Sequence, residues 1–84
     1  MLTVYSKAQC PYCDQAKALL NAKGIQFEEI RVDLDPSAKD FLVEKGHRTV
    51  PQIYQNGVLF VEGGFQGLST LTESQIKEKL NVNQ

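Results

Sequence analysis

Two cysteines separated by two residues, Cys10 and Cys13, are the side chains of this sequence best suited to covalent chemistry. A disulfide over so short a loop restricts the unfolded chain little, so it would add little stability. In a reducing compartment such a pair is transient and reactive rather than structural. The spacing therefore indicates thiol–disulfide exchange.

The residues around the pair predict which sulfur reacts first. Pro11 is typical of the first position of a helix, which places Cys10 at the N-cap and Cys13 in the first turn. The Cys10 sulfur would then face unpaired N–H groups, those of Tyr12 and Cys13, and the positive end of the helix dipole. We expect Cys10 to form the attacking thiolate. Cys13, deeper in the helix, would be the more buried sulfur and would resolve the intermediate.

Two charges near the pair act in opposite directions. Lys7, three residues before Cys10, would favour the thiolate, and Asp14 would oppose it. We expect Asp14 to be solvated and its effect to be screened.

Two other interpretations of the cysteines are weaker. They could be two small buried hydrophobic residues. A zinc site needs four ligands, and beyond the two sulfurs the chain offers one histidine, His47, and ordinary carboxylates, so no metal is expected. We expect His47 to be a solvated residue near a helix end.

The first half of the chain has the pattern of a strand, a helix and a second strand. Residues 2–5 are β-prone and suited to a buried central strand. A helix is predicted from Pro11 to Lys23, with Gly24 just beyond its end. Residues 25–34 predict a second strand, and its pattern slips at Glu28-Glu29, which indicates a bulge or an early end.

The second half begins with a helix that Asp35-Pro36 starts and Lys45-Gly46 ends. Residues 51–55 and 58–62 then flank Asn56-Gly57, a strong hairpin signal.

Gly63-Gly64 follows the hairpin at a place where the backbone needs unusual angles or a close approach. A short helix fits residues 65–71. Thr72 and Gln75 have the spacing of a capping box that opens a last helix, with Ile76 and Leu80 buried.

The predicted order is β-α-β-α-β-β-α, an α/β fold. The first β-α-β unit is parallel and the hairpin antiparallel, so the sheet is mixed, about four strands wide and flanked by helices. Ligands of such sheets bind beyond the carboxyl ends of the parallel strands, where Cys10 falls. We expect a single domain spanning residues 1–84.

Composition excludes several classes of partner. With 42% hydrophobic and 23% charged residues and a formal net charge of -1, the chain has no overall field to hold nucleic acid or an anionic membrane. No apolar run approaches the ~20 residues of a membrane span, and residues 1–7 resemble no signal or transit peptide. We expect a cytoplasmic monomer.

Three segments, in order, resemble motifs of the dithiol glutaredoxins. Lys7-Ala8-Gln9-Cys10-Pro11-Tyr12-Cys13 resembles their active-site segment, Arg48-Thr49-Val50-Pro51-Gln52-Ile53 their Thr-Val-Pro loop, and Gly63-Gly64-Phe65 their Gly-Gly turn. The resemblance covers essentially the whole chain, and it is to the short bacterial and phage members.

This resemblance implies a thioredoxin-like fold, with Pro51 in cis facing the cysteines, and a groove that binds glutathione as co-substrate. Lys7 and Arg48 would meet the glycine-end carboxylate. Val50 would pair through its backbone with the cysteinyl unit, and the N–H groups of Phe65 and Gln66 would meet the γ-glutamyl carboxylate. The full set implied for the groove is Lys7, Tyr12, Arg48, Thr49, Val50, Pro51, Gly64, Phe65 and Gln66.

One position departs from the family pattern. Many glutaredoxins have an acidic residue after the Gly-Gly turn that meets the γ-glutamyl ammonium, and this chain has Gln66-Gly67 there. Recognition of the ammonium would then come from Gln66, from water or from nothing, and affinity for glutathione would fall.

The resulting hypothesis is a glutathione-dependent oxidoreductase that reduces protein disulfides and glutathione mixed disulfides. By family analogy, ribonucleotide reductase is among its partners. Three alternatives stay open: a redoxin of the same fold recharged by thioredoxin reductase, a carrier of an iron–sulfur cluster between two subunits, and a catalytically silent interaction domain. Pro11 argues against the cluster carrier because it stiffens the cysteine loop.

Overall fold

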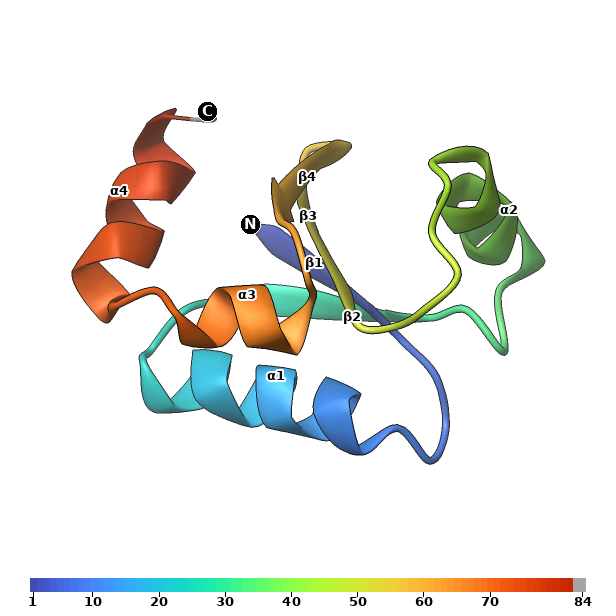
Figure 1. Cartoon of the computed structure of the whole chain (residues 1–84), viewed down its shortest axis with the longest axis horizontal. Helices are drawn as coiled ribbons and strands as arrows, with labels where there is room; N and C mark the ends of the chain where they lie inside the picture. Colours follow the sequence, from blue (N-terminus) through green and yellow to red (C-terminus); the bar gives the residue numbers. More distant parts are fainter. Residues whose placement is uncertain (83–84) are drawn as a thin grey trace.

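A four-stranded sheet with the strand order β2-β1-β3-β4 forms the centre of the computed structural model, which describes residues 1–82 (Figure 1). The strands are β1 (Leu2–Ser6), β2 (Phe27–Arg31), β3 (Gln52–Gln55) and β4 (Val58–Val61). β1 runs parallel to β2 and antiparallel to β3, and β3 is antiparallel to β4. The predicted mixed sheet with a central first strand is confirmed.

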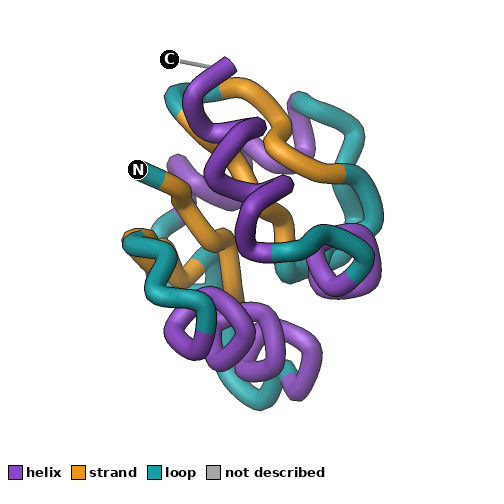
Figure 2. Tube along the Cα trace, turned by 90° about the vertical axis from the view of Figure 1, so that its left-hand side faces the viewer, coloured by secondary structure: helices purple, strands orange, loops and turns teal. Residues whose placement is uncertain are grey.

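Helices cover the sheet on both sides. They are α1 (Pro11–Ala22), α2 (Pro36–Glu44), α3 (Phe65–Ser69) and α4 (Glu73–Val82). Figure 1 shows α1 and α3 on one side of the strands and α2 on the other, and Figure 2 shows the strands between helices. Within residues 1–82, no helix is long and apolar enough to cross a membrane.

The main core lies between the sheet, α1, α3 and α4. Its buried members are Leu2, Val4, Ala16, Leu20, Ile25, Ile53, Phe60, Leu68 and Ile76. Ile76 of α4 is fully buried as predicted, whereas Leu80 is only partly buried.

The predicted helix boundaries have the expected caps. The Asp35 carboxylate accepts hydrogen bonds from the N–H groups of Ser37 and Ala38 at the start of α2. Thr72 and Gln75 form a reciprocal capping box, with backbone-to-side-chain distances of 2.9 and 3.1 Å. These local bonds explain why the helix starts could be located from the sequence.

The second strand is shorter than predicted. It covers Phe27–Arg31 rather than residues 25–34, and its pairing with β1 has no bulge. β2 is an edge strand, and both Glu28 and Glu29 are exposed to solvent. Two consecutive polar residues interrupt the alternation of apolar and polar residues, which explains the slip in the sequence pattern. Leu34 lies in the loop after the strand with 73% of its surface exposed. The irregular pairing is instead in β3 and β4, between Ile53 and Tyr54.

The hairpin turn is as predicted, with positive φ at Asn56 (52°) and Gly57 (82°).

On the face covered by α2, aromatic rings form a second, smaller cluster. Tyr5, Phe41 and Tyr54 pack at centroid distances of 5.2 to 5.7 Å. Burial raises the pKa of both tyrosines. His47, expected to be solvated, is half-buried here, and its Nε2 lies 2.7 Å from the Tyr54 hydroxyl. The expectation was wrong because the chain turns inward directly after α2, where the His47 N–H donates to the Leu42 carbonyl.

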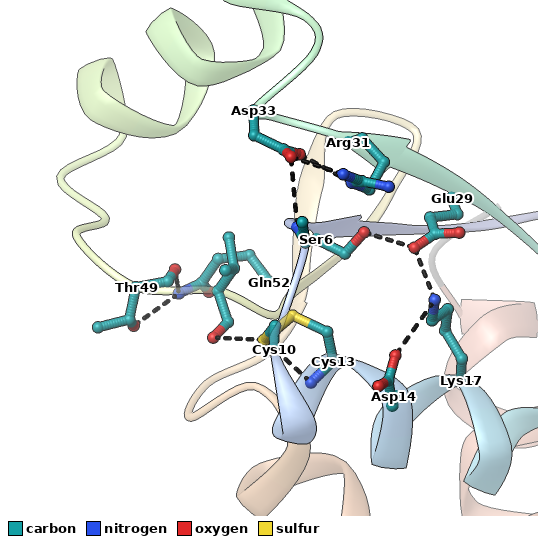
Figure 3. Close-up of a disulfide and its surroundings, with 12 residues drawn as sticks. Ser6, Cys10, Cys13, Asp14, Lys17, Glu29, Arg31, Asp33, Thr49 and Gln52 are labelled. Atoms are coloured by element: carbon teal, nitrogen blue, oxygen red, sulfur yellow. Dashed lines mark hydrogen bonds and ion pairs between the residues drawn. A yellow bond between two sulfur atoms is a disulfide. The ribbon is translucent and has the colours of Figure 1, made fainter.

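A polar network joins β1, β2 and α1 near the cysteines (Figure 3). The buried Ser6 hydroxyl donates to Glu29 at 2.6 Å, and Lys17 donates to the same carboxylate oxygen at 2.7 Å. The bond from Lys17, and then that from Ser6, hold the Glu29 pKa below its ordinary value. The hydrogen bond between Lys17 and Glu29 also raises the pKa of Lys17.

Gly67 allows α3 to pack directly against the end of β4. A Cβ at this position would overlap the Glu62 carbonyl oxygen and lie 2.9 Å from Val61 Cγ2. Because the nearest obstacle is backbone, no side-chain rotation could relieve the overlap.

We therefore expect Gly67→Ala to lower the free energy of unfolding by about 1–3 kcal/mol, despite the better helix propensity of alanine. Urea denaturation followed by circular dichroism measures the change. Ser69→Ala, at an exposed position of the same helix, is the control and should change stability by less than about 0.5 kcal/mol. Equal stabilities of the two variants would show that α3 can move away from β4 without cost.

The Glu29 network predicts a pH-dependent contribution to stability. A carboxyl with a depressed folded pKa stabilises the fold above its unfolded pKa of about 4.5 and loses this contribution as pH falls through the folded pKa. Glu29→Gln should therefore cost about 1 kcal/mol or less at pH 7, and progressively less below pH ~4.5. Urea denaturation of both proteins from pH 7 to pH 3 measures the difference, and a difference constant over that range would contradict the assignment.

Candidate active site

Cys10 is the N-cap of α1, as predicted. Its backbone is extended (φ -122°, ψ 94°), and its Sγ accepts a hydrogen bond from the Cys13 N–H at 3.2 Å. The predicted bond from the Tyr12 N–H is not among the hydrogen bonds of the described chain. One amide therefore holds the sulfur.

The two sulfurs form a disulfide, so the structure is that of the oxidised protein (Figure 3). Cys10 is 7% exposed and Cys13 1%. The predicted difference in burial is thus present, and Cys10 is the sulfur nearer to solvent. In the reduced protein the Cys13 amide and the helix end would stabilise negative charge on Cys10, which is the condition for nucleophilic attack.

The neighbouring carboxylate of Asp14 is exposed to solvent, as expected. Its side chain is 76% exposed, and its carboxylate lies 3.6 Å from Lys17 Nζ. The partial neutralisation by Lys17 reduces its effect on Cys10.

The loop before Cys10 is tied to the segment after β2, a contact the sequence did not reveal. The Ala8 N–H donates to Asp33 at 3.3 Å, and Arg31 donates to both oxygens of that carboxylate at 2.8 and 2.6 Å. These bonds, with Arg31 the largest cause, lower the Asp33 pKa to about 2. Gln9 takes a left-handed conformation (φ 54°) directly before Cys10. These contacts fix the backbone conformation of the loop that leads to the start of α1.

The segment before β3 lies opposite the disulfide. The Val50 carbonyl oxygen is 3.8 Å from Cys10 Sγ, and the Val50–Pro51 peptide bond is cis, as the resemblance implied. Gln52 Nε2 donates to the Thr49 carbonyl at 2.9 Å and so supports the loop.

The Gly63-Gly64 turn approaches the same place from β4. Gly64 has a φ of 58°, and a Cβ there would lie 2.4 Å from the Pro51 carbonyl oxygen. Only glycine fits, so the predicted close approach is observed. Phe65, next in the chain, stacks on the exposed Tyr12 ring at a centroid distance of 6.1 Å. Tyr12 is therefore a packed rim of the site rather than a free surface side chain.

Two open grooves share the lining residues His47, Thr49 and Val50. The larger, of about 710 Å³, contains most of the residues implied by the resemblance: Tyr12, Thr49, Val50, Pro51, Phe65 and Gln66. The smaller, of about 300 Å³, contains Lys7 and Arg48. Gly64 lines neither and supports the turn. Eight of the nine residues implied by the resemblance thus line one or both grooves, and Val50, which lines both, lies beside Cys10.

Sequence reasoning missed part of the larger groove. Its further lining includes Lys45, His47, Gln52, Leu59 and Glu62. These residues come from β3, from β4 and from the segments that follow α2 and β4. No local sequence motif predicts them, because only the topology brings them together. In the described part of the chain, no cluster of three or more His, Cys, Asp or Glu side chains could hold a metal ion.

Comparison with known proteins agrees with this geometry. The glutaredoxin family model matches residues 2–60. Glutaredoxin 3 of Escherichia coli K12 is 42% identical over 52 residues, which is 61% of this chain and 63% of that relative, so the match spans less than two thirds of the relative.

Two solved structures extend the similarity to almost the whole chain. A buckwheat glutaredoxin–glutathione complex superimposes with a TM-score of 0.74 and 26% identity, covering 96% of this chain and 76% of that one. The glutaredoxin-like NrdH-redoxin of E. coli, described as having a thioredoxin-like activity profile, gives 0.70 and 26%, covering 92% and 91%. With a family match over most of its length and the disulfide at the expected helix start, this chain belongs to the glutaredoxin family.

Proposed function

We propose that the protein is a thiol–disulfide oxidoreductase that reduces protein disulfides and glutathione mixed disulfides and uses glutathione as its reductant. The observation that carries the proposal is the Cys10–Cys13 disulfide at the start of α1, with the Cys10 sulfur bound to a helix amide and bordered by Val50. A reducing cytoplasm is the compartment that such a cycle requires.

The cycle begins with the dithiol. The Cys10 thiolate attacks one sulfur of the substrate disulfide, forms a mixed disulfide and releases the other sulfur as a thiolate. Cys13 then loses its proton and attacks Cys10 Sγ, which releases the reduced substrate and leaves the Cys10–Cys13 disulfide. One glutathione thiolate opens that disulfide by forming a mixed disulfide with Cys10, and a second releases oxidised glutathione.

The grooves offer complementary groups for glutathione. Lys7 and Arg48 line the smaller groove, where a carboxylate would meet two cations. Val50 lies beside Cys10, where an extended cysteinyl unit could pair with its backbone. Phe65 and Gln66 line the larger groove, where a second carboxylate could meet their N–H groups. The similarity to a glutaredoxin solved with glutathione supports this arrangement.

A second candidate is a redoxin of the same fold recharged by thioredoxin reductase, with ribonucleotide reductase as its client. The specific observation in its favour is Gln66-Gly67, which leaves α3 without a carboxylate. The similarity to NrdH-redoxin supports it as well.

The assigned roles of the sulfurs predict different effects of two substitutions. Cys10→Ser removes the nucleophile and should abolish turnover of every disulfide substrate. Cys13→Ser removes only the resolving thiol, so it should keep most activity on a glutathione mixed disulfide and lose at least about 10²-fold on a protein disulfide. Steady-state assays with both substrates measure this, and equal losses for Cys13→Ser on both would refute the roles.

The two reductants can be separated with the wild-type protein. In parallel assays with the same protein disulfide, glutathione with glutathione reductase should sustain turnover, and thioredoxin reductase alone should sustain less than about a tenth of that rate. NADPH consumption at 340 nm reports both reactions. Faster turnover with thioredoxin reductase would transfer the proposal to the second candidate.

A further inference from the structure

The larger groove carries one negative charge among the described residues that line it. That charge belongs to Glu62, whereas Lys45 and His47 are the basic side chains of the lining. Glu62 is exposed and forms no ion pair with another residue of the described range 1–82. Its carboxylate is therefore available to a ligand.

The backbone of Glu62 is positioned by close packing. The residue lies between the end of β4 and the Gly63-Gly64 turn, and α3 packs against its carbonyl oxygen where Gly67 has no side chain. Hydrogen bonds from the Gln66 and Leu68 N–H groups to the carbonyls of Gly63 and Gly64 hold the turn. The Cα atom of Glu62, from which its side chain extends, is thus fixed near Phe65 and Gln66.

No other residue at this end of the groove can supply a negative charge. Gln66 is neutral, and Gly67 cannot be replaced by an acid without moving the Glu62 backbone. A cationic group bound beside Phe65 and Gln66 would therefore meet Glu62 or water.

We infer that Glu62 is a specificity-determining residue that selects ligands with a primary ammonium at this end of the groove. The inference rests on the proposed function, in which this end receives the γ-glutamyl unit of glutathione with its α-ammonium. It names a residue for a contact that sequence reasoning left to Gln66, water or nothing. Because Glu62 is exposed, the gain is modest, about threefold to fivefold in affinity, and weakens with salt.

The test uses a ligand pair that differs only in the ammonium. Reduced wild-type protein and Glu62→Gln are titrated with S-methylglutathione and with its des-amino counterpart, S-methylated glutaryl-cysteinyl-glycine, followed by NMR chemical shifts. The variant should bind S-methylglutathione about threefold to fivefold more weakly and the des-amino ligand equally well. Glu44→Gln, an exposed acid at the end of α2 outside both grooves, is the charge-matched control and should change neither affinity.

Steady-state kinetics with glutathione supply a second measurement. Glu62→Gln should raise the KM for glutathione by the same factor, leave kcat unchanged and reduce the salt dependence of kcat/KM, and Glu62→Asp should restore part of the loss. The inference would be overturned if Glu62→Gln changed the affinity for both ligands equally or for neither. It would also be overturned if the wild-type protein bound neither ligand or bound both equally well. If the ligands are distinguished but glutathione does not sustain turnover, the proposed function fails while the role of Glu62 stands.

Discussion

The site depends on the contact between one sulfur and an amide in the first turn of α1. A helix start leaves N–H groups without backbone partners, and here the Cys13 N–H is directed at Cys10 Sγ. That contact favours negative charge on Cys10, and the greater burial of Cys13 is consistent with the different roles proposed for the two thiols. Two chemically identical residues three positions apart thus have different surroundings because of their places in one helical turn, and the proposed roles follow from that difference.

The remainder of the fold brings three other segments to this helix start. Because β1 is central, the loop that leaves it for α1 lies beside the segments that enter β3 and leave β4. The Asp33 carboxylate accepts a hydrogen bond from the loop before Cys10. The Val50 carbonyl oxygen lies 3.8 Å from Cys10 Sγ, and the turn packs against Pro51 at Gly64. The approach of the turn to the Pro51 carbonyl oxygen is too close for any side chain, which explains why glycine is required at position 64.

The parts of this arrangement that could be predicted from the sequence are those encoded locally. The Cys10 N-cap, the Asp35 cap, the Asn56-Gly57 hairpin and the Thr72–Gln75 box depend on neighbours within four residues, and all four are confirmed. The predictions that were wrong or missing concern features that depend on contacts between segments far apart in the sequence. The sequence pattern could show neither that β2 lies at the sheet edge, nor that His47 turns inward to Tyr54, nor that Asp33 holds the loop before Cys10.

The charge of the larger groove is also decided by contacts between distant segments, and the local sequence does not reveal it. Judged by the chain alone, the replacement of an acid by Gln66-Gly67 reads as the loss of a charge. In the fold, the glycine is what lets α3 close on the Glu62 carbonyl, and that packing fixes the backbone of a carboxylate that lines the groove. The missing side chain at Gly67 and the carboxylate five residues earlier thus meet in one packing contact, and ligand preference in this family member has to be judged from the groove as a whole.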